Sequence, residues 1–143
     1  MILVDVNLLL YATDGDSPHH AKAHRWLREV LSRPEPIRLS WAAVLGFLRI
    51  ATDARVQARP LQIAQAAAIM DEWLALPNVE ILAPGERHWK ILLEQLGRAQ
   101  VRGPLVMDAH LAALAIEHGA ILATADKDFL RFPGLRVEYP LEA

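Results

Sequence analysis

Three aspartates stand where apolar segments of this sequence end. Asp5 directly follows the apolar run 1–4, and Asp126 and Asp128 come just after the apolar segment 120–124. Short apolar runs of this kind are typical of strands buried on both faces of a parallel sheet. Because ligands of open parallel sheets gather at the carboxyl ends of the strands, we expect these three side chains to meet at one sheet edge.

A fourth aspartate, Asp108, comes from an expected helix over residues 107–118. It lies in the first turn of that helix, and its i+3, i+4 and i+7 neighbours are Leu111, Ala112 and Ala115. These apolar neighbours place Asp108 on the face that turns toward the interior, where a surface acid would not lie. The start of this helix is therefore a second source of carboxylate for the same edge.

Each carboxylate also has a purely structural interpretation. Asp5 could begin a turn with Asn7, and Asp108 could cap its helix. Asp126 and Asp128 could shape a turn. Taken together, however, three or four carboxylates at one edge repel one another, so the folded state needs protonation or a bound cation. Oxygen ligands without His or Cys favour Mg²⁺ or Mn²⁺ over zinc.

The composition indicates one compact domain without cysteine chemistry. The chain of 143 residues is 53% hydrophobic, has a net charge of -2 and contains no cysteine. We expect a single domain over 1–143, because a chain of this size folds without disulfides, and thiolate zinc sites are excluded. No basic leader opens the sequence, and the longest apolar run, 41–48, is far shorter than the ~20 residues of a membrane helix. We therefore expect a cytoplasmic protein with no membrane partner.

The overall charge gives no attraction to nucleic acid. The pI is about 6.3, so any site for a polyanion has to be local. Twelve of the fifteen basic residues are arginine, whose planar side chain binds phosphate in a bidentate way. A general arginine bias of the chain explains the same count.

The remaining pattern alternates short apolar strands with helices, without a linker or repeat. We expect strands at 1–4, 79–82, 120–124 and around 135–138, and helices at 20–31, 41–54, from Pro60 to Pro77, from Pro84 to the region of Gly97, and at 107–118 with Gly119 as the C-cap. The helix at 41–54 is apolar on most sides, so we expect it to be buried. This alternation predicts the α/β class, with a small parallel sheet flanked by helices.

Tryptophan and histidine give weaker signals. The helical spacing of the four tryptophans favours core packing over base stacking: Trp26, Trp41, Trp73 and Trp89. His20 and His24 stand one helical turn apart but lack a third ligand, so we expect surface imidazoles. His110 is expected to be a partly exposed helix residue, with contact to a substrate phosphate as the alternative.

Three ordered motifs resemble the signatures of PIN-domain ribonucleases. They are the opening Asp-Val-Asn-Leu-Leu-Leu-Tyr, the segment Met-Asp-Ala-His-Leu-Ala-Ala-Leu-Ala from Met107, and the segment Leu-Ala-Thr-Ala-Asp-Lys-Asp-Phe from Leu122. An Asp-x-Asn alone would be weak, whereas three motifs in order over one short chain are specific. The resemblance covers essentially the whole chain, is strongest to the VapC toxin branch and implies a three-layer α/β/α fold.

The resemblance also implies a site and partners. It makes Asp5, Asp108 and Asp126 the catalytic carboxylates that hold Mg²⁺ or Mn²⁺, with Asp128 as an auxiliary member and Asn7 as the polar residue that shapes the site. It further implies an RNA substrate and a homodimer. A small cognate antitoxin would lay a peptide across the acidic cleft.

One position departs from the family's pattern. Family members commonly carry a Glu three residues before an Arg on an early helix, and here that register holds Gly46 before Arg49. The missing acid leaves open whether a second metal ion binds and what activates the water; Asp128 or a bound water could substitute. Arg49 is either a counter-charge beside the acidic site or a solvated helix residue.

These observations predict a metal-dependent endoribonuclease, the toxin of a toxin-antitoxin pair. The first alternative is a PIN scaffold that binds RNA or antitoxin without cutting, because Gly46 replaces the usual acid. A second is an aspartyl-phosphate phosphatase, which Asp5 and Asn7 suggest only faintly, since that class needs a second Asp at position 7.

Overall fold

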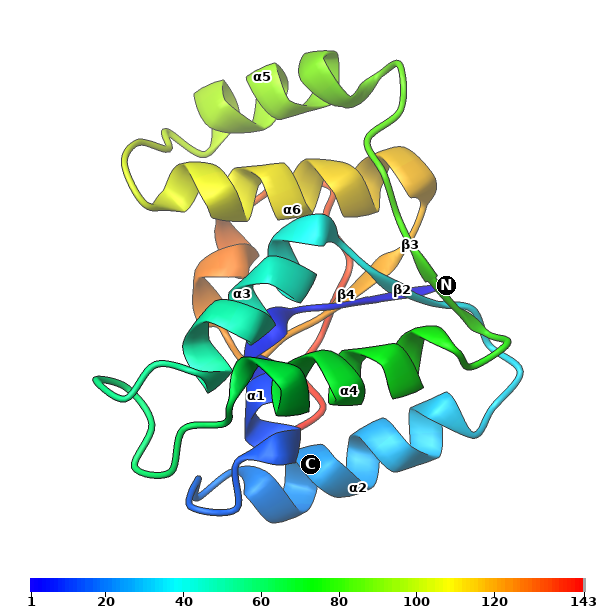
Figure 1. Cartoon of the computed structure of the whole chain (residues 1–143). Coiled ribbons are helices and arrows are strands. Elements are labelled where there is room, and N and C mark those ends of the chain that lie inside the picture. The colour runs from blue at the N-terminus through cyan, green and yellow to red at the C-terminus, as the bar shows by residue number, and fades with distance from the viewer. Residues whose placement is uncertain (143) are drawn as a thin grey trace.

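The computed structural model describes residues 1–142 as a parallel sheet covered by helices (Figure 1). The strands are β1 (Ile2–Val4), β2 (Ile37–Leu39), β3 (Val79–Ile81), β4 (Ile121–Ala123) and β5 (Val137–Glu138). The helices are α1 (Val6–Thr13), α2 (His20–Leu31), α3 (Trp41–Ala51), α4 (Ile63–Leu74), α5 (His88–Arg98), α6 (Leu105–His118) and the 3₁₀ helix η1 (Lys127–Arg131). The predicted α/β class is confirmed.

The sheet has the strand order β3-β2-β1-β4-β5, with every neighbouring pair parallel. β1 is the central strand, and its residue Val4 pairs with Ala123 of β4. The backbone N–H of Asp5 then donates to the carbonyl of Ala123 at 2.9 Å. The carboxyl ends of β1 and β4 are thus level, so the residues that follow these strands lie side by side.

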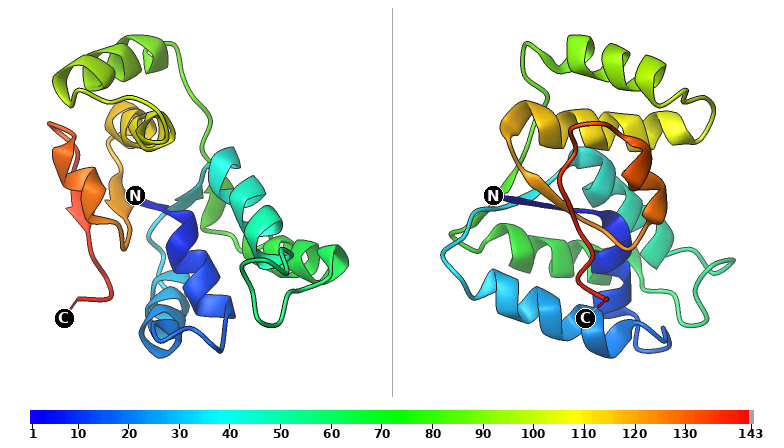
Figure 2. Two further views of the ribbon diagram at one scale, coloured as in Figure 1. Left: turned by 90° about the vertical axis from the view of Figure 1, so that its left-hand side faces the viewer. Right: turned by 180° about the vertical axis from the view of Figure 1, so that it is seen from behind.

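Alternation along β1 divides the interior into two cores. Ile2 and Val4 face a core built with α1, α2, α3 and α4, whereas Leu3 faces a second core built mainly with α6 and η1. Helix α5 adds Leu92 and Leu96 to the second core from the outer side of α6, as Figure 2 shows. The chain therefore has helices on both faces of a thin sheet.

Three elements were not predicted from the sequence, and one of them, η1, occupies the loop expected after the strand at 120–124. Helix α1 begins directly after Asp5, whose side chain accepts from the N–H of Val6 as an N-cap, and its eight residues are too short to display a helical period. Strand β2 contains only Ile37, Arg38 and Leu39 between Pro36 and Ser40, without an apolar run.

Several predicted boundaries were wrong by a few residues. Helix α3 ends at Ala51 rather than 54, and α4 begins at Ile63 rather than at Pro60, where Gln62 and Gln65 form a capping box. Helix α5 begins at His88 rather than at Pro84. The C-cap at Gly119 is confirmed, with a φ of 67° that favours glycine.

Tryptophan packing was predicted correctly for only half of the set. Trp26 and Trp73 pack against the first core, but Trp41 is 57% and Trp89 is 65% exposed. Leu45 of α3 is 60% exposed, so the expectation of a buried helix there was also wrong. Helical spacing identifies a face but not what covers it. Within residues 1–142, no helix is long and apolar enough to cross a membrane.

Candidate active site

Asp5 is held rigidly at the junction of β1 and α1. One carboxylate oxygen accepts from the N–H of Val6 at 2.7 Å, and the other accepts from the hydroxyl of Thr124 at 2.7 Å and the amide of Asn7 at 3.2 Å. Only 9% of Asp5 is exposed. Burial raises the pKa of this carboxyl, and the hydrogen bonds oppose that rise.

Asn7 and Thr124 tie the ends of β1 and β4 together. The side-chain oxygen of Asn7 accepts from the N–H of Ala125 at 3.3 Å, while its amide lies 3.4 Å from the hydroxyl oxygen of Thr124. That same hydroxyl oxygen accepts from the N–H of Asp126 at 3.0 Å. The loop that carries Asp126 is therefore fixed relative to Asp5. Thr124 was not predicted as a site residue, and its place at the end of an expected strand was the only signal for it.

Asp108, Asp126 and Asp128 form one acidic group. A carboxylate oxygen from each lies within 4.8 Å of the others, a spacing that one ion could bridge. Asp108 stands in the first turn of α6, and Asp126 caps η1 by accepting from the N–H of Asp128 at 2.8 Å. Asp5 lies outside this group, although its charge helps to raise the pKa of Asp108 and the charge of Asp126 helps to raise the pKa of Asp5.

Burial and neighbouring negative charges both act on Asp108. Burial, followed by the charges of Asp126, Asp5 and Asp128, raises the pKa of Asp108 to about 6. Arg131 opposes the rise; its guanidinium lies 3.9 Å from a carboxylate oxygen of Asp128. Sequence reasoning did not identify Arg131, although its place three residues after Asp128 was visible. A cation at this site would relieve the repulsion, and the all-oxygen donor set fits Mg²⁺ or Mn²⁺.

Gly46 and Arg49 occupy different surroundings. A Cβ on Gly46 would meet a methyl carbon of Val6 at 3.4 Å, so α3 passes close to the first turn of α1 beside Asp5. Arg49 is exposed near the end of α3, where its charge helps to lower the pKa of Asp53, after the larger effect of Arg55. The cation that acts on Asp108 is Arg131.

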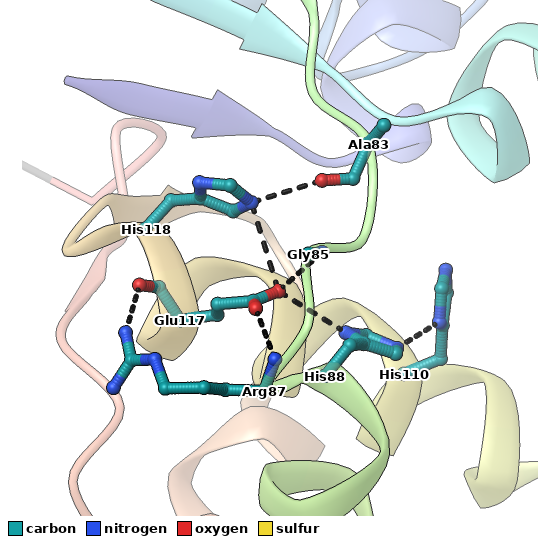
Figure 3. Close-up of polar contacts among 7 residues, drawn as sticks. All are labelled: Ala83, Gly85, Arg87, His88, His110, Glu117 and His118. Carbon is teal, nitrogen blue, oxygen red and sulfur yellow. Dashed lines mark hydrogen bonds and ion pairs between the residues drawn. The ribbon is translucent and has the colours of Figure 1, made fainter.

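His110 faces α5 rather than the acidic group. Its Nδ1 lies 2.9 Å from Nε2 of His88, and burial lowers its pKa. His88 belongs to a network that also includes Glu117, whose carboxylate accepts from the N–H groups of Gly85 at 2.8 Å and Arg87 at 3.0 Å (Figure 3). This network explains why α5 starts later than predicted, because a side chain of α6 holds the segment before it.

The predicted surface histidines are partly confirmed. His24 is exposed, and His20 is half-buried with Nδ1 3.0 Å from the carbonyl oxygen of Tyr11. The rings of His20 and His24 stand 5.4 Å apart. Within residues 1–142, the group of Asp108, Asp126 and Asp128 is the sole cluster of three or more His, Cys, Asp or Glu side chains that could hold a metal ion.

The sequence as a whole matches a known family. The PIN domain family matches residues 2–135. This chain belongs to the PIN-domain family. Among PIN-domain proteins it is similar to ribonuclease VapC33 of Mycobacterium tuberculosis, with 44% identity over 141 residues that span 99% of each chain. It is also 41% identical to ribonuclease VapC37 of the same organism over 140 residues, 98% of this chain and 97% of the relative. The chain is thus a VapC-type PIN-domain protein.

Solved structures share the fold of this chain. A solved VapBC2 complex from Rickettsia felis, bound to a DNA fragment from its promoter, contains a chain that superposes with a TM-score of 0.70 at 20% identity. The superposition covers 96% of this PIN-domain chain and 98% of that chain. At this identity the likeness concerns the fold alone, and it confirms the predicted PIN-like architecture.

Proposed function

We propose that this PIN-domain protein is an endoribonuclease that hydrolyses RNA phosphodiester bonds with a divalent cation, and that it is the toxin of a VapBC-type pair acting in the cytoplasm. The convergence of Asp108, Asp126 and Asp128 within 4.8 Å carries the proposal. The names of the relatives VapC33 and VapC37 as ribonucleases support the substrate class.

The carboxylates divide into two roles in this proposal. Asp108 and Asp126 hold Mg²⁺ or Mn²⁺, with Asp128 as the auxiliary ligand. When bound, such an ion lowers the pKa of a water molecule and polarises a phosphoryl oxygen. Asp5, which the resemblance made a metal ligand, lies outside the group of three; in this proposal it contributes to the negative field and is kept in place by Thr124 and the N–H of Val6. Rigid supports of this kind suit a reaction that depends on accurate placement.

The number of ions follows from the carboxylates available. The family's usual Glu is replaced by Gly46, which contributes no ligand. We therefore propose one tightly held ion, with a second that arrives together with the RNA. Metal binding also requires ionised ligands, so the proton on Asp108 competes with the cation below a pH of about 6.

Two protein partners belong to the same proposal. A small cognate antitoxin that covers the acidic cleft is supported by the VapBC complex that shares this fold. A second copy of the chain is supported by exposed apolar side chains on two helices, a pattern that marks interaction surfaces. These side chains are Trp41, Leu45, Trp89 and Leu93.

The alternative function is a scaffold that binds RNA or antitoxin without cutting. It is favoured by Gly46, which stands where the family usually has a Glu. Cleavage of a fluorogenic RNA with Mg²⁺ or Mn²⁺ separates the two. We expect wild-type protein and the control Asp71→Asn, an exposed α4 residue, to cut. Asp5→Asn and Asp108→Asn should lose cleavage. RNA binding without cutting in either metal would instead support the scaffold.

A further inference from the structure

A pocket of about 330 Å³ opens directly beside the acidic group. Its wall includes Thr124 and Ala125, the two residues before Asp126. The opposite wall comes from the end of α1, the start of α2 and the segment after β5, with Tyr11, Lys22 and Tyr139 among its residues. Figure 2 shows this last segment running past α1 toward the beginning of α2. The volume lies within the range of small-ligand sites.

Tyr11, His19 and Tyr139 are the aromatic residues of the pocket lining. The ring of Tyr11 lies 4.7 Å from the imidazole of His19, measured between centroids. Tyr139 contributes a second ring and donates its hydroxyl proton to the carbonyl of Asp126 at 3.1 Å. The pocket is thereby attached to the same loop as the carboxylates. Aromatic faces of this kind are where unpaired nucleic-acid bases stack.

The charge of the pocket has the sign that a phosphate requires. Glu142 is the acidic residue of its lining, and it is paired with Lys127 at 2.7 Å. Lys127 also lies over the ring of Tyr139, 3.7 Å from the centroid. The ammonium of Lys22 donates to the carbonyl of Leu141 at 3.3 Å and has no carboxylate within 4.0 Å among residues 1–142. Among residues 1–142, Lys22 is therefore the ammonium of the pocket lining that has no paired carboxylate.

We propose that this pocket binds one nucleotide of the RNA next to the phosphodiester that is cut, with its base against the rings of Tyr11 and Tyr139 and its phosphate at Lys22. The proposal rests on the proposed ribonuclease function. The pocket would then help to determine which sequence is cleaved, because the edge of a base stacked there can be recognised by hydrogen bonds. It also separates two tasks: the acidic group takes the reacting phosphate, and the pocket takes its neighbour.

The first test measures binding without cleavage. AMP, GMP, CMP and UMP are titrated in EDTA into isotope-labelled full-length protein and followed by NMR. We expect at least one of them to shift the signals of Tyr11, Tyr139 and Lys22. The variant Lys22→Gln should weaken that binding about tenfold, or about 1.4 kcal/mol. The control Arg25→Gln, an exposed α2 residue outside the pocket, should not. Shifts confined to other surfaces, or none, would overturn the proposal.

The second test measures sequence preference in RNA. Wild type, Lys22→Gln and Tyr139→Leu are compared on oligonucleotides that vary the base on either side of the cleaved bond, with Tyr139→Phe as the control that keeps the ring. We expect kcat/KM to fall about tenfold for the preferred base and the preference to flatten in the first two variants, with melting temperatures checked. If the variants cut RNA with the same base preference as wild type, the proposed role of the pocket would be refuted, while the ribonuclease function would be retained. Nucleotide binding by a protein that cuts no RNA would overturn the ribonuclease function, and with it the role of the pocket in cleavage, while leaving the pocket as a nucleotide-binding site.

Discussion

Replacing Asp108 by Asn should stabilise the metal-free protein at alkaline pH. The site raises the pKa of Asp108 from 3.8 to about 6, mainly through burial and then through the neighbouring carboxylates. Such a rise corresponds to about 3 kcal/mol at full strength. Because the side chain is half-buried, solvent screening reduces this to about 1.5 kcal/mol, and the expected increase in melting temperature is about 3–6 °C.

The stability gained by Asp108→Asn should increase with pH. A carboxyl whose pKa is raised by folding destabilises the native state when it is ionised. For Asp108 this loss of folding free energy is complete above a pH of about 6. The loss fades as the pH falls through that value, and it is absent below the unfolded value of 3.8. The advantage of Asp108→Asn should therefore be largest at pH 8 in EDTA and vanish by about pH 4.

Manganese should reverse the order of stabilities. At a concentration of one hundred times the dissociation constant, a bound ion stabilises the native state by about 2.7 kcal/mol. Wild-type protein should gain this stability at pH 8, whereas Asp108→Asn should gain much less. Thermal melts at three pH values, with and without MnCl₂, measure both effects, and Asp71→Asn serves as the control. A variant less stable than wild type in EDTA at pH 8 would refute the electrostatic reasoning.

Three further outcomes are expected. Calorimetric titration of Mn²⁺ into the metal-free protein should find one tight site, and two equally tight sites without RNA would contradict the role given to the missing acid. Glu117→Ala should lower the free energy of unfolding by about 1–3 kcal/mol in urea denaturation, because two backbone amides before α5 lose their acceptor, while the exposed Glu86→Ala should change little. Trp41→Arg should convert a dimer to a monomer in light scattering, whereas Leu130→Arg, at a position of η1 that is 66% exposed, should not; a monomeric wild type would contradict the proposed dimer.

Sequence patterns located the ends of elements where the acids lie. The run before Asp5 and the apolar segment before Asp126 sufficed because buried parallel strands leave a distinct apolar signature. Asp108 could be assigned to the inward face by its helical spacing. The proximity of Asp128 to this group followed from its place in the same loop. Metal binding by these residues stays a prediction.

Tertiary contacts explain what the sequence could not supply. Thr124 matters because its hydroxyl bonds to Asp5, 119 residues away, and Glu117 matters because it holds the chain before α5. Neither contact leaves a local pattern. The exposure of Trp41 and Trp89 was missed for a related reason, since spacing alone does not distinguish an interior face from an exposed one.

Anomalous diffraction from crystals soaked in MnCl₂ tests the central claim most directly. We predict one strong manganese peak between the carboxylates of Asp108 and Asp126, within reach of Asp128, that disappears in Asp108→Asn crystals. A peak elsewhere on the surface, or no peak at a concentration that supports RNA cleavage, would contradict it.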